Sequence, residues 1–264
     1  MLRFIKKTIR NIIPTRMHVP LKYWYAFIRG YTEPEMTLLK NIIVAESNVI
    51  DAGANQGIYS YFISKFCKNI QIFEPNSECF NLLKSWANSH ENIIVYNEAL
   101  SNEDRLASLL IPIDQHGVEH DSSASIENNN FSQTREETVR LNKLDSFNFS
   151  EIDFIKIDVE GHEFPLLQGA YNTIKISKPC LLIEIEQRHN KKSIFEIFNF
   201  LEDLDYLCFY LDEGKLYSFS EFNIAIHQQN QNINTEKKYI NNFLFFDKFK
   251  FDQGHYSNLK EYFL

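Results

Sequence analysis

Residues 48–57 read Asn48-Val49-Ile50-Asp51-Ala52-Gly53-Ala54-Asn55-Gln56-Gly57. An apolar run of strand length ends here in an acid, and two glycines four residues apart lead into a helical pattern. Ligands of open α/β sheets lie at the carboxyl ends of the strands, and glycine lets the backbone approach a ligand where a Cβ would block it. The stretch predicts a ligand-binding turn with Asp51, Gly53, Asn55 and Gly57 as binding residues, Gly57 by letting the helix pack closely on the strand.

A second acid ends the next predicted strand, in the sequence Phe73-Glu74-Pro75-Asn76. Glu74 follows Asp51 by 23 residues, and an acid at this distance in a nucleotide-binding fold can accept both hydroxyls of a ribose. We therefore expect the ligand to carry a nucleoside, held in part by Glu74, Pro75 and Asn76.

The glycine loop also bears on which nucleoside is bound. NAD enzymes use a G-x-G-x-x-G loop to hold a pyrophosphate, and here Asn55 occupies the place of the second glycine. Asp51 suits a cationic amino-acid tail better than a phosphate. S-adenosylmethionine (SAM) carries an ammonium and a sulfonium and no phosphate, so SAM is the predicted cofactor. An NAD-dependent sugar oxidoreductase and a binding or scaffold module without turnover are the alternatives.

The end of the third predicted strand is expected to face the adenine. It is followed by Asn97-Glu98-Ala99-Leu100-Ser101. We predict that Ala99 and Leu100 line the ring and that Ser101 or Asn97 reaches its edge; an ordinary exposed turn is the alternative.

Strands alternate with helices on both sides of these motifs, which predicts βαβ units and a parallel sheet. The expected strands are 48–52, 69–73, 92–96, 106–111, 138–141, 153–157, 180–185, 206–211, 216–219 and 243–246, and the expected helices are 34–43, 57–66, 77–89, 163–175 and 193–204. A polar stretch at 114–137 interrupts the alternation, and a loop of this length is either functional or disordered.

A second cluster of titratable groups lies in Ile155-Lys156-Ile157-Asp158-Val159-Glu160-Gly161-His162-Glu163. Crowded ionisable groups at a strand end perturb one another's pKa and mark candidate functional sites. We hypothesise that Asp158 stands near the sulfonium and ammonium of the cofactor. His162 or Glu160 would then act as the general base, with helix capping or surface placement as the purely structural alternatives.

The next strand ends in a further carboxylate pair, Glu184 and Glu186. We expect only one of them to point into the site. No metal is predicted, although Asp158 and Glu186 could together hold Mg²⁺ in a sharper alternative. Arg188 and His189 follow and could bind substrate, or be solvated loop charges.

These motifs, in this order, resemble FkbM-type methyltransferases. The match covers about residues 46–186 and the late strand at 242–244, and its most specific part is the string from Lys156 to Glu163. The resemblance implies a class I Rossmann-like α/β fold, a three-layer sandwich with a mostly parallel seven-stranded sheet. It also implies SAM-dependent O-methylation of a hydroxyl on a sugar, glycolipid, polysaccharide or related metabolite. The acceptor itself is not carried over, because the polar stretch lies where the family varies.

The chain is expected to hold an N-terminal helical extension (1–45) and one methyltransferase domain (46–264). The net charge of −8 argues against a nucleic-acid partner, and the four cysteines are expected to be reduced. No apolar run is long enough to span a bilayer, so a cytoplasmic location is the default. Residues 1–13 show an apolar helical stripe opposite basic residues. They are expected either to pack on the domain or to contact membrane peripherally, which would favour a lipid-linked acceptor.

Overall fold

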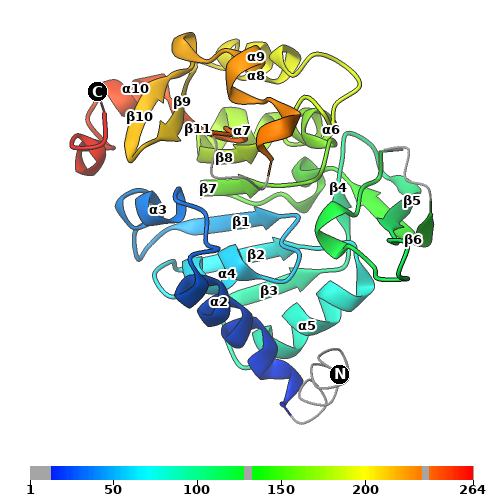
Figure 1. The fold of residues 1–264 in the computed structure, drawn as a ribbon. Coiled ribbons are helices and arrows are strands. Elements are labelled where there is room, and N and C mark those ends of the chain that lie inside the picture. Colours follow the sequence, from blue (N-terminus) through cyan, green and yellow to red (C-terminus); the bar gives the residue numbers. More distant parts are fainter. Residues whose placement is uncertain (1–12, 128–132, 234–237, 264) are drawn as a thin grey trace.

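The central element of the fold is a twisted, mostly parallel sheet (Figure 1). The computed structural model describes residues 13–127, 133–233 and 238–263. The strand order is β10-β9-β11-β8-β7-β1-β2-β3. The bounds are β1 Asn48–Ala52, β2 Asn69–Phe73, β3 Ile93–Tyr96, β7 Ile152–Ile157, β8 Cys180–Glu184, β9 Tyr206–Asp212, β10 Lys215–Ser218 and β11 Asn242–Asp247. β3, β2, β1, β7 and β8 run parallel, and β11, β9 and β10 join by antiparallel pairing.

Helices cover both faces of this sheet, which confirms the three-layer α/β architecture (Figure 1). Successive strand residues belong to two separate apolar cores. Val49 packs with the helices on one face of the sheet, and Ile50 packs with those on the other. The first face carries α2 His18–Arg29, α3 Met36–Ile42, α4 Ile58–Ile63 and α5 Ser77–Ala87, and the second carries α6 Glu163–Gly169, α7 Tyr171–Ser177 and α8 Phe195–Glu202. Both faces of the parallel strands are thus buried, as their near-continuous apolar sequence requires.

The expected count of seven strands is wrong, because the main sheet has eight. The additional strand is β10, which turns back from β9 through Glu213 and Gly214, both in the left-handed region. The sequence predicts these two strands at 206–211 and 216–219.

A second, smaller sheet contains β4 Ala99–Leu100, β6 Thr134–Asn142 and β5 Arg105–Pro112. The expected strands 106–111 and 138–141 lie within β5 and β6. The polar stretch at 114–137, expected as a loop, contains the start of β6 and a 3₁₀ turn at Asp121–Ser123. This sheet stands beside the carboxyl ends of the main strands (Figure 1).

Two further differences separate the structure from the sequence expectations, and one expected helix is not tested. α2 was not expected from the sequence, although its buried residues Val19, Tyr23 and Ala26 recur at helical spacing. The expected helix 163–175 is two helices, divided at Ala170. The helix expected within residues 1–13 lies almost wholly outside the described residues.

The remaining helices are α9 Ile224–His227 and α10 Lys248–Asp252. α2 and α3 bury Val19, Tyr23, Leu38 and Leu39 in the same apolar core as β1. In the part of the chain that the structure describes, no helix is long and apolar enough to cross a membrane. The four cysteines are free thiols.

Candidate functional site

A cavity of about 610 Å³ opens at the carboxyl ends of β1, β2 and β7. Most of the residues singled out from the sequence line it: Asp51, Gly53, Asn55, Glu74, Pro75, Ala99, Leu100, Asp158, Glu160 and His162. Gly57, Asn76 and Ser101 do not belong to the lining. The cavity therefore gathers both sequence clusters into one place, as parallel strands that end at the same edge require.

Gly53 brings the β1 loop into close contact with the end of β7. Its φ is +81°, and a Cβ built on it would lie 1.8 Å from the backbone oxygen of Asp158. The Gly53 amide donates to the Phe73 carbonyl at 2.9 Å, which joins the loop to β2 as well. Only glycine combines this positive φ with room for the Asp158 carbonyl, so the floor of the cavity depends on Gly53.

Glu74 is a buried carboxylate that organises the neighbouring loops. Its two oxygens accept hydrogen bonds from the backbone amides of Asn55 (2.6 Å) and Asn76 (2.8 Å). Burial raises the pKa of Glu74 to about 7, and these two amides oppose that rise. Each carboxylate oxygen has further lone pairs, and the residue lines the cavity, so it can still accept hydrogen bonds from a ligand.

Asp51 lies at the end of β1 and is almost completely buried. The Ser60 hydroxyl of α4 donates to one of its oxygens. Burial raises the pKa of Asp51 to about 6, partly offset by the Ser60 hydrogen bond and the charge of Lys156. Asp51 is also part of the cavity lining.

Two predicted binding residues have structural roles. The Asn76 side chain caps α5 by accepting from the amides of Glu78 and Cys79, and it donates to Asp121 at 3.1 Å. A Cβ on Gly57 would lie 2.6 Å from Leu83 of α5 and 3.0 Å from Val19 of α2. Gly57 therefore permits helix packing, but against other helices rather than against the strand.

Lys156 is the main charged residue of the site that the sequence analysis did not select. It is buried in β7, with Nζ 3.4 Å from Asp158 Oδ2 and 5.1 Å from the centroid of the Tyr59 ring. Burial alone would lower its pKa, but the surrounding carboxylates, led by Asp158 and Glu33, raise it above the ordinary value. A cation between Ile155 and Ile157 in an otherwise apolar strand was the signal that could have revealed it.

Glu160 projects into the cavity from a strained turn. Its φ is +51°, and Gly161 follows at +96°. His189 Nδ1 pairs with Glu160 Oε2 from behind. Burial raises the pKa of Glu160. For His189, burial alone would lower the pKa, but the hydrogen bond that its ring donates to Glu160 raises the pKa overall.

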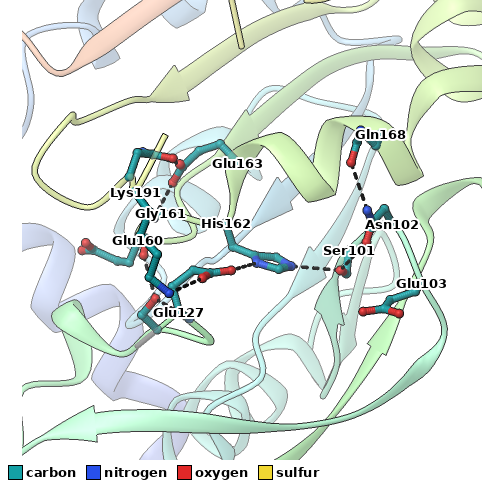
Figure 2. Close-up of polar contacts among 12 residues, drawn as sticks. Ser101, Asn102, Glu103, Glu127, Glu160, Gly161, His162, Glu163, Gln168 and Lys191 are labelled. Atoms are coloured by element: carbon teal, nitrogen blue, oxygen red, sulfur yellow. Dashed lines mark hydrogen bonds and ion pairs between the residues drawn. The ribbon is translucent and has the colours of Figure 1, made fainter. Parts of the chain in front are cut away.

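His162 is held on both ring nitrogens, as Figure 2 shows: Nε2 lies 2.9 Å from Ser101 Oγ and Nδ1 lies 3.0 Å from Glu127 Oε1. The hydrogen bond from His162 is the main cause that lowers the pKa of Glu127. Ser101 is buried in this contact, which takes its hydroxyl away from the place where an adenine edge was expected. The imidazole thus ties the chain near 127 to the β4 end.

The segment 119–126 lies across the cavity and contributes to its lining. It is fastened at both ends: Asn76 Nδ2 contacts Asp121 at 3.1 Å, and the Ser125 hydroxyl donates to the Glu160 carbonyl at 2.7 Å. Ser125 also exchanges two backbone hydrogen bonds with Leu110 of β5. This part of the polar stretch therefore forms a wall of the site.

Glu184 is the last residue of β8 and Glu186 follows it, and the two carboxylates have different surroundings. Glu184 lines the cavity and accepts from Asn241 Nδ2 at 2.7 Å. Glu186 is buried, and Arg188 holds it with two hydrogen bonds of 2.6 and 2.8 Å, joined by the Tyr239 hydroxyl. Glu186 is thus engaged by Arg188 and Tyr239 and is not part of the cavity lining. The described residues contain no group of three or more His, Cys, Asp or Glu side chains arranged to hold a metal ion.

A mostly parallel sheet with two acids at adjacent strand ends and a glycine-bounded cavity is characteristic of class I SAM-binding enzymes. The model of the methyltransferase FkbM domain matches residues 51–208. The chain belongs to the FkbM methyltransferase family, and its cofactor is S-adenosylmethionine.

Among solved structures, the chain is similar to an FkbM methyltransferase from Methylobacillus flagellatus KT, with 16% identity and a TM-score of 0.50. That alignment covers 77% of this chain and 44% of the other, so this chain spans less than half of that protein. Two more distant matches are a SAM-dependent methyltransferase from Aquifex aeolicus (16% identity, 72% and 93% covered, TM-score 0.39) and a Streptococcus mutans protein in complex with SAH (10% identity, 81% and 98% covered, TM-score 0.48). A search of curated proteins found no significant match.

Proposed function

We propose that this chain is a SAM-dependent O-methyltransferase that methylates a hydroxyl of a sugar, a glycolipid or polysaccharide, or a related metabolite. The observation that carries the proposal is the pair of buried carboxylates Asp51 and Glu74, which end neighbouring parallel strands and line one cavity. Two acids on neighbouring strand ends suit the cationic amino-acid end and the ribose of one ligand.

The site fits SAM by the chemistry of its donor set. Glu74 would accept from the ribose hydroxyls, Asp51 and Asp158 would face the positive charges, and Ala99 and Leu100 would supply an apolar wall for the base. The cradle at Gly53, which a Cβ would fill, allows a ligand to lie against the backbone. When bound, SAM supplies a methyl group attached to a sulfonium. The neutral thioether that remains after transfer is a good leaving group.

Glu160 is the better supported of the two candidate general bases. A hydroxyl must lose its proton as it attacks, and a base is most effective when its pKa lies near the working pH. Burial raises the pKa of Glu160 in that direction, and the side chain faces the cavity. His189 behind it orients the carboxylate. His162 has both nitrogens engaged and is assigned a positioning role, as is the buried Glu163, which accepts the Gly161 amide at 2.8 Å.

The charge of the cavity favours an uncharged acceptor. Nine acidic side chains line it: Glu33, Asp51, Glu74, Glu98, Glu119, Asp121, Asp158, Glu160 and Glu184. The one arginine in the lining, Arg188, is paired with Glu186. A phosphorylated or carboxylated group entering this cavity would be repelled by the acids, whereas a neutral polyol would find many hydrogen-bond acceptors.

Calorimetry with SAM, SAH and NAD tests the cofactor, and a panel of sugars tests the acceptor. We expect SAM and SAH to bind and NAD not to. Release of SAH, measured by mass spectrometry, should rise with neutral glycosides and not with matched sugar phosphates. Binding of NAD alone would favour the oxidoreductase alternative. SAM binding without turnover on any hydroxyl acceptor would favour the binding-module alternative.

A further inference from the structure

Helix α2 is apolar on the side that faces solvent as well as on the side that faces the core. Val19, Tyr23 and Ala26 are buried. The outward side and the residue after the C-cap carry six large side chains that are each 42–78% exposed: Leu21, Trp24, Tyr25, Phe27, Ile28 and Tyr31. Leu21, Trp24, Tyr25 and Ile28 occupy positions i, i+3, i+4 and i+7, so they form one face of the helix.

This outward face is bordered by cations. Arg16 precedes the helix, and Lys22 and Arg29 lie within it. Lys65, just after α4, places its Nζ 5.1 Å from the centroid of the Trp24 ring. Residues 1–32 contain seven Lys and Arg and no Asp or Glu, whereas the whole chain carries −8. The remainder therefore carries −15, since −8 minus +7 is −15.

The charge distribution decides between the partners that could cover such a face. A second copy of this chain, packed face to face, would bring two positive segments together. An anionic bilayer complements both features, because aromatic side chains favour the interfacial region and Lys and Arg extend toward lipid phosphates. A helix of this kind lies in the membrane plane and does not cross it.

The same face runs to the mouth of the cavity. α2 ends at Gly30 in the left-handed conformation, and the next residue, Tyr31, is exposed, hydrogen-bonded to Arg29 at 3.2 Å, and part of the cavity lining. Thr32 and Glu33 continue the lining. A surface bound to α2 would therefore lie next to the entrance used by an acceptor.

We propose that the outward face of α2, from Leu21 to Tyr31, docks the protein on an anionic lipid surface and sets the mouth of the cavity against it. Docking does not require that the chain be a methyltransferase, since it is carried by the exposed face and its charge. If the proposed function also holds, the acceptor is a hydroxyl of a lipid-linked molecule.

The test is co-sedimentation of the full chain with vesicles of phosphatidylcholine alone or with phosphatidylglycerol added. Ile28→Ser on α2 (78% exposed) is matched by Ile176→Ser on α7 (81% exposed) as the control. We expect binding to phosphatidylglycerol vesicles that weakens with salt, a roughly tenfold loss for Ile28→Ser, and no change for Ile176→Ser.

Tryptophan fluorescence gives a second readout. The chain has two tryptophans, of which Trp24 is 46% exposed and Trp86 only 2%. Adding anionic vesicles should shift the emission to the blue as Trp24 leaves water.

Failure to bind anionic vesicles, or an equal loss in both serine variants, would overturn the proposal. So would a concentration-dependent dimer that Ile28→Ser disrupts in the absence of lipid, since a second copy would then cover the face. SAM binding by calorimetry separates these outcomes from failure of the proposed function.

Discussion

The backbone oxygen of Asp158 occupies the space that a side chain on Gly53 would need, because a Cβ there would lie 1.8 Å away. This contact joins the two strand ends that hold the cofactor loop and the acidic cluster. The loop after β1 and the turn after β7 therefore form two sides of one cavity floor.

Gly53→Ala tests this contact. The change should abolish measurable SAM binding and destabilise the fold by more than the conformational strain alone, which is about 1–2 kcal/mol for a residue in the left-handed region. Gly214→Ala is the matched control, since Gly214 has a similar φ of +77° but nothing within 4 Å of its Cβ position. Calorimetry and urea unfolding measure both effects. Equal losses in the two variants would show that strain, and not the approach of Asp158, decides the outcome.

Lys156→Met removes the buried cation while keeping the length of the side chain. Asp51, Asp158 and Glu184 would then face one another without compensation. Removing one partner of a buried ionic cluster typically costs about 3–5 kcal/mol, so we expect a loss of this order in urea unfolding at pH 7. The exposed Lys175→Met should change stability by no more than about 0.5 kcal/mol. A stable Met variant would contradict the role of Lys156 as the counter-charge of the site.

Glu160→Gln should lower kcat by about 10²–10⁴, the usual contribution of a general base, while SAM affinity stays near that of the wild type. Because burial raises the pKa of Glu160, the wild-type rate should fall as pH drops below that raised value, and the Gln variant should lose this limb of the profile. Glu103→Gln, an exposed carboxylate paired with Arg105, is the control. An unchanged kcat would show that Glu160 is not the general base.

We expect Glu35 to make the free energy of unfolding depend on pH, independently of catalysis. It is 7% exposed, one of its oxygens has no hydrogen-bond partner, and burial raises its pKa from 4.5 to about 7. The folded state binds this proton more tightly than the unfolded state, so stability falls as pH rises from about 4.5 to about 7. The rise of about 2.5 units corresponds to ~3 kcal/mol above pH 7.

Glu35→Gln should therefore be more stable than the wild type at pH 8, by up to ~3 kcal/mol, and nearly equal to it at pH 4.5. Urea unfolding at both pH values measures the difference. Glu46→Gln, whose carboxylate is 84% exposed, should show none. Parallel pH dependence of the wild type and Glu35→Gln would remove Glu35 from the account.

The sequence was most informative where local pattern and tertiary structure agree. The strands β1, β2 and β7 are apolar runs that end in an acid, so their existence, direction and shared edge followed from the pattern alone. α2 was missed although its buried residues recur at helical spacing. Large apolar side chains also lie on its exposed side, so hydrophobicity alone does not show which face is buried.

Within the site, residue identity could be predicted but side-chain direction could not. Asn76 and Ser101 lie at the expected strand ends, yet their polar atoms are used by α5 and by His162. The pairing of Glu160 with His189 joins positions 29 residues apart. No local pattern encodes such a contact, because it depends on how the turns after β7 and β8 pack together.

The central claim is that Asp51 and Glu74 hold the two ends of one nucleoside cofactor, and SAH binding to three proteins tests it most directly. Wild type should bind SAH in isothermal calorimetry. Glu74→Gln and Asp51→Asn should each weaken binding by about 10- to 100-fold, as expected for loss of a hydrogen bond to a charged group. Undiminished affinity in both folded variants would contradict the account.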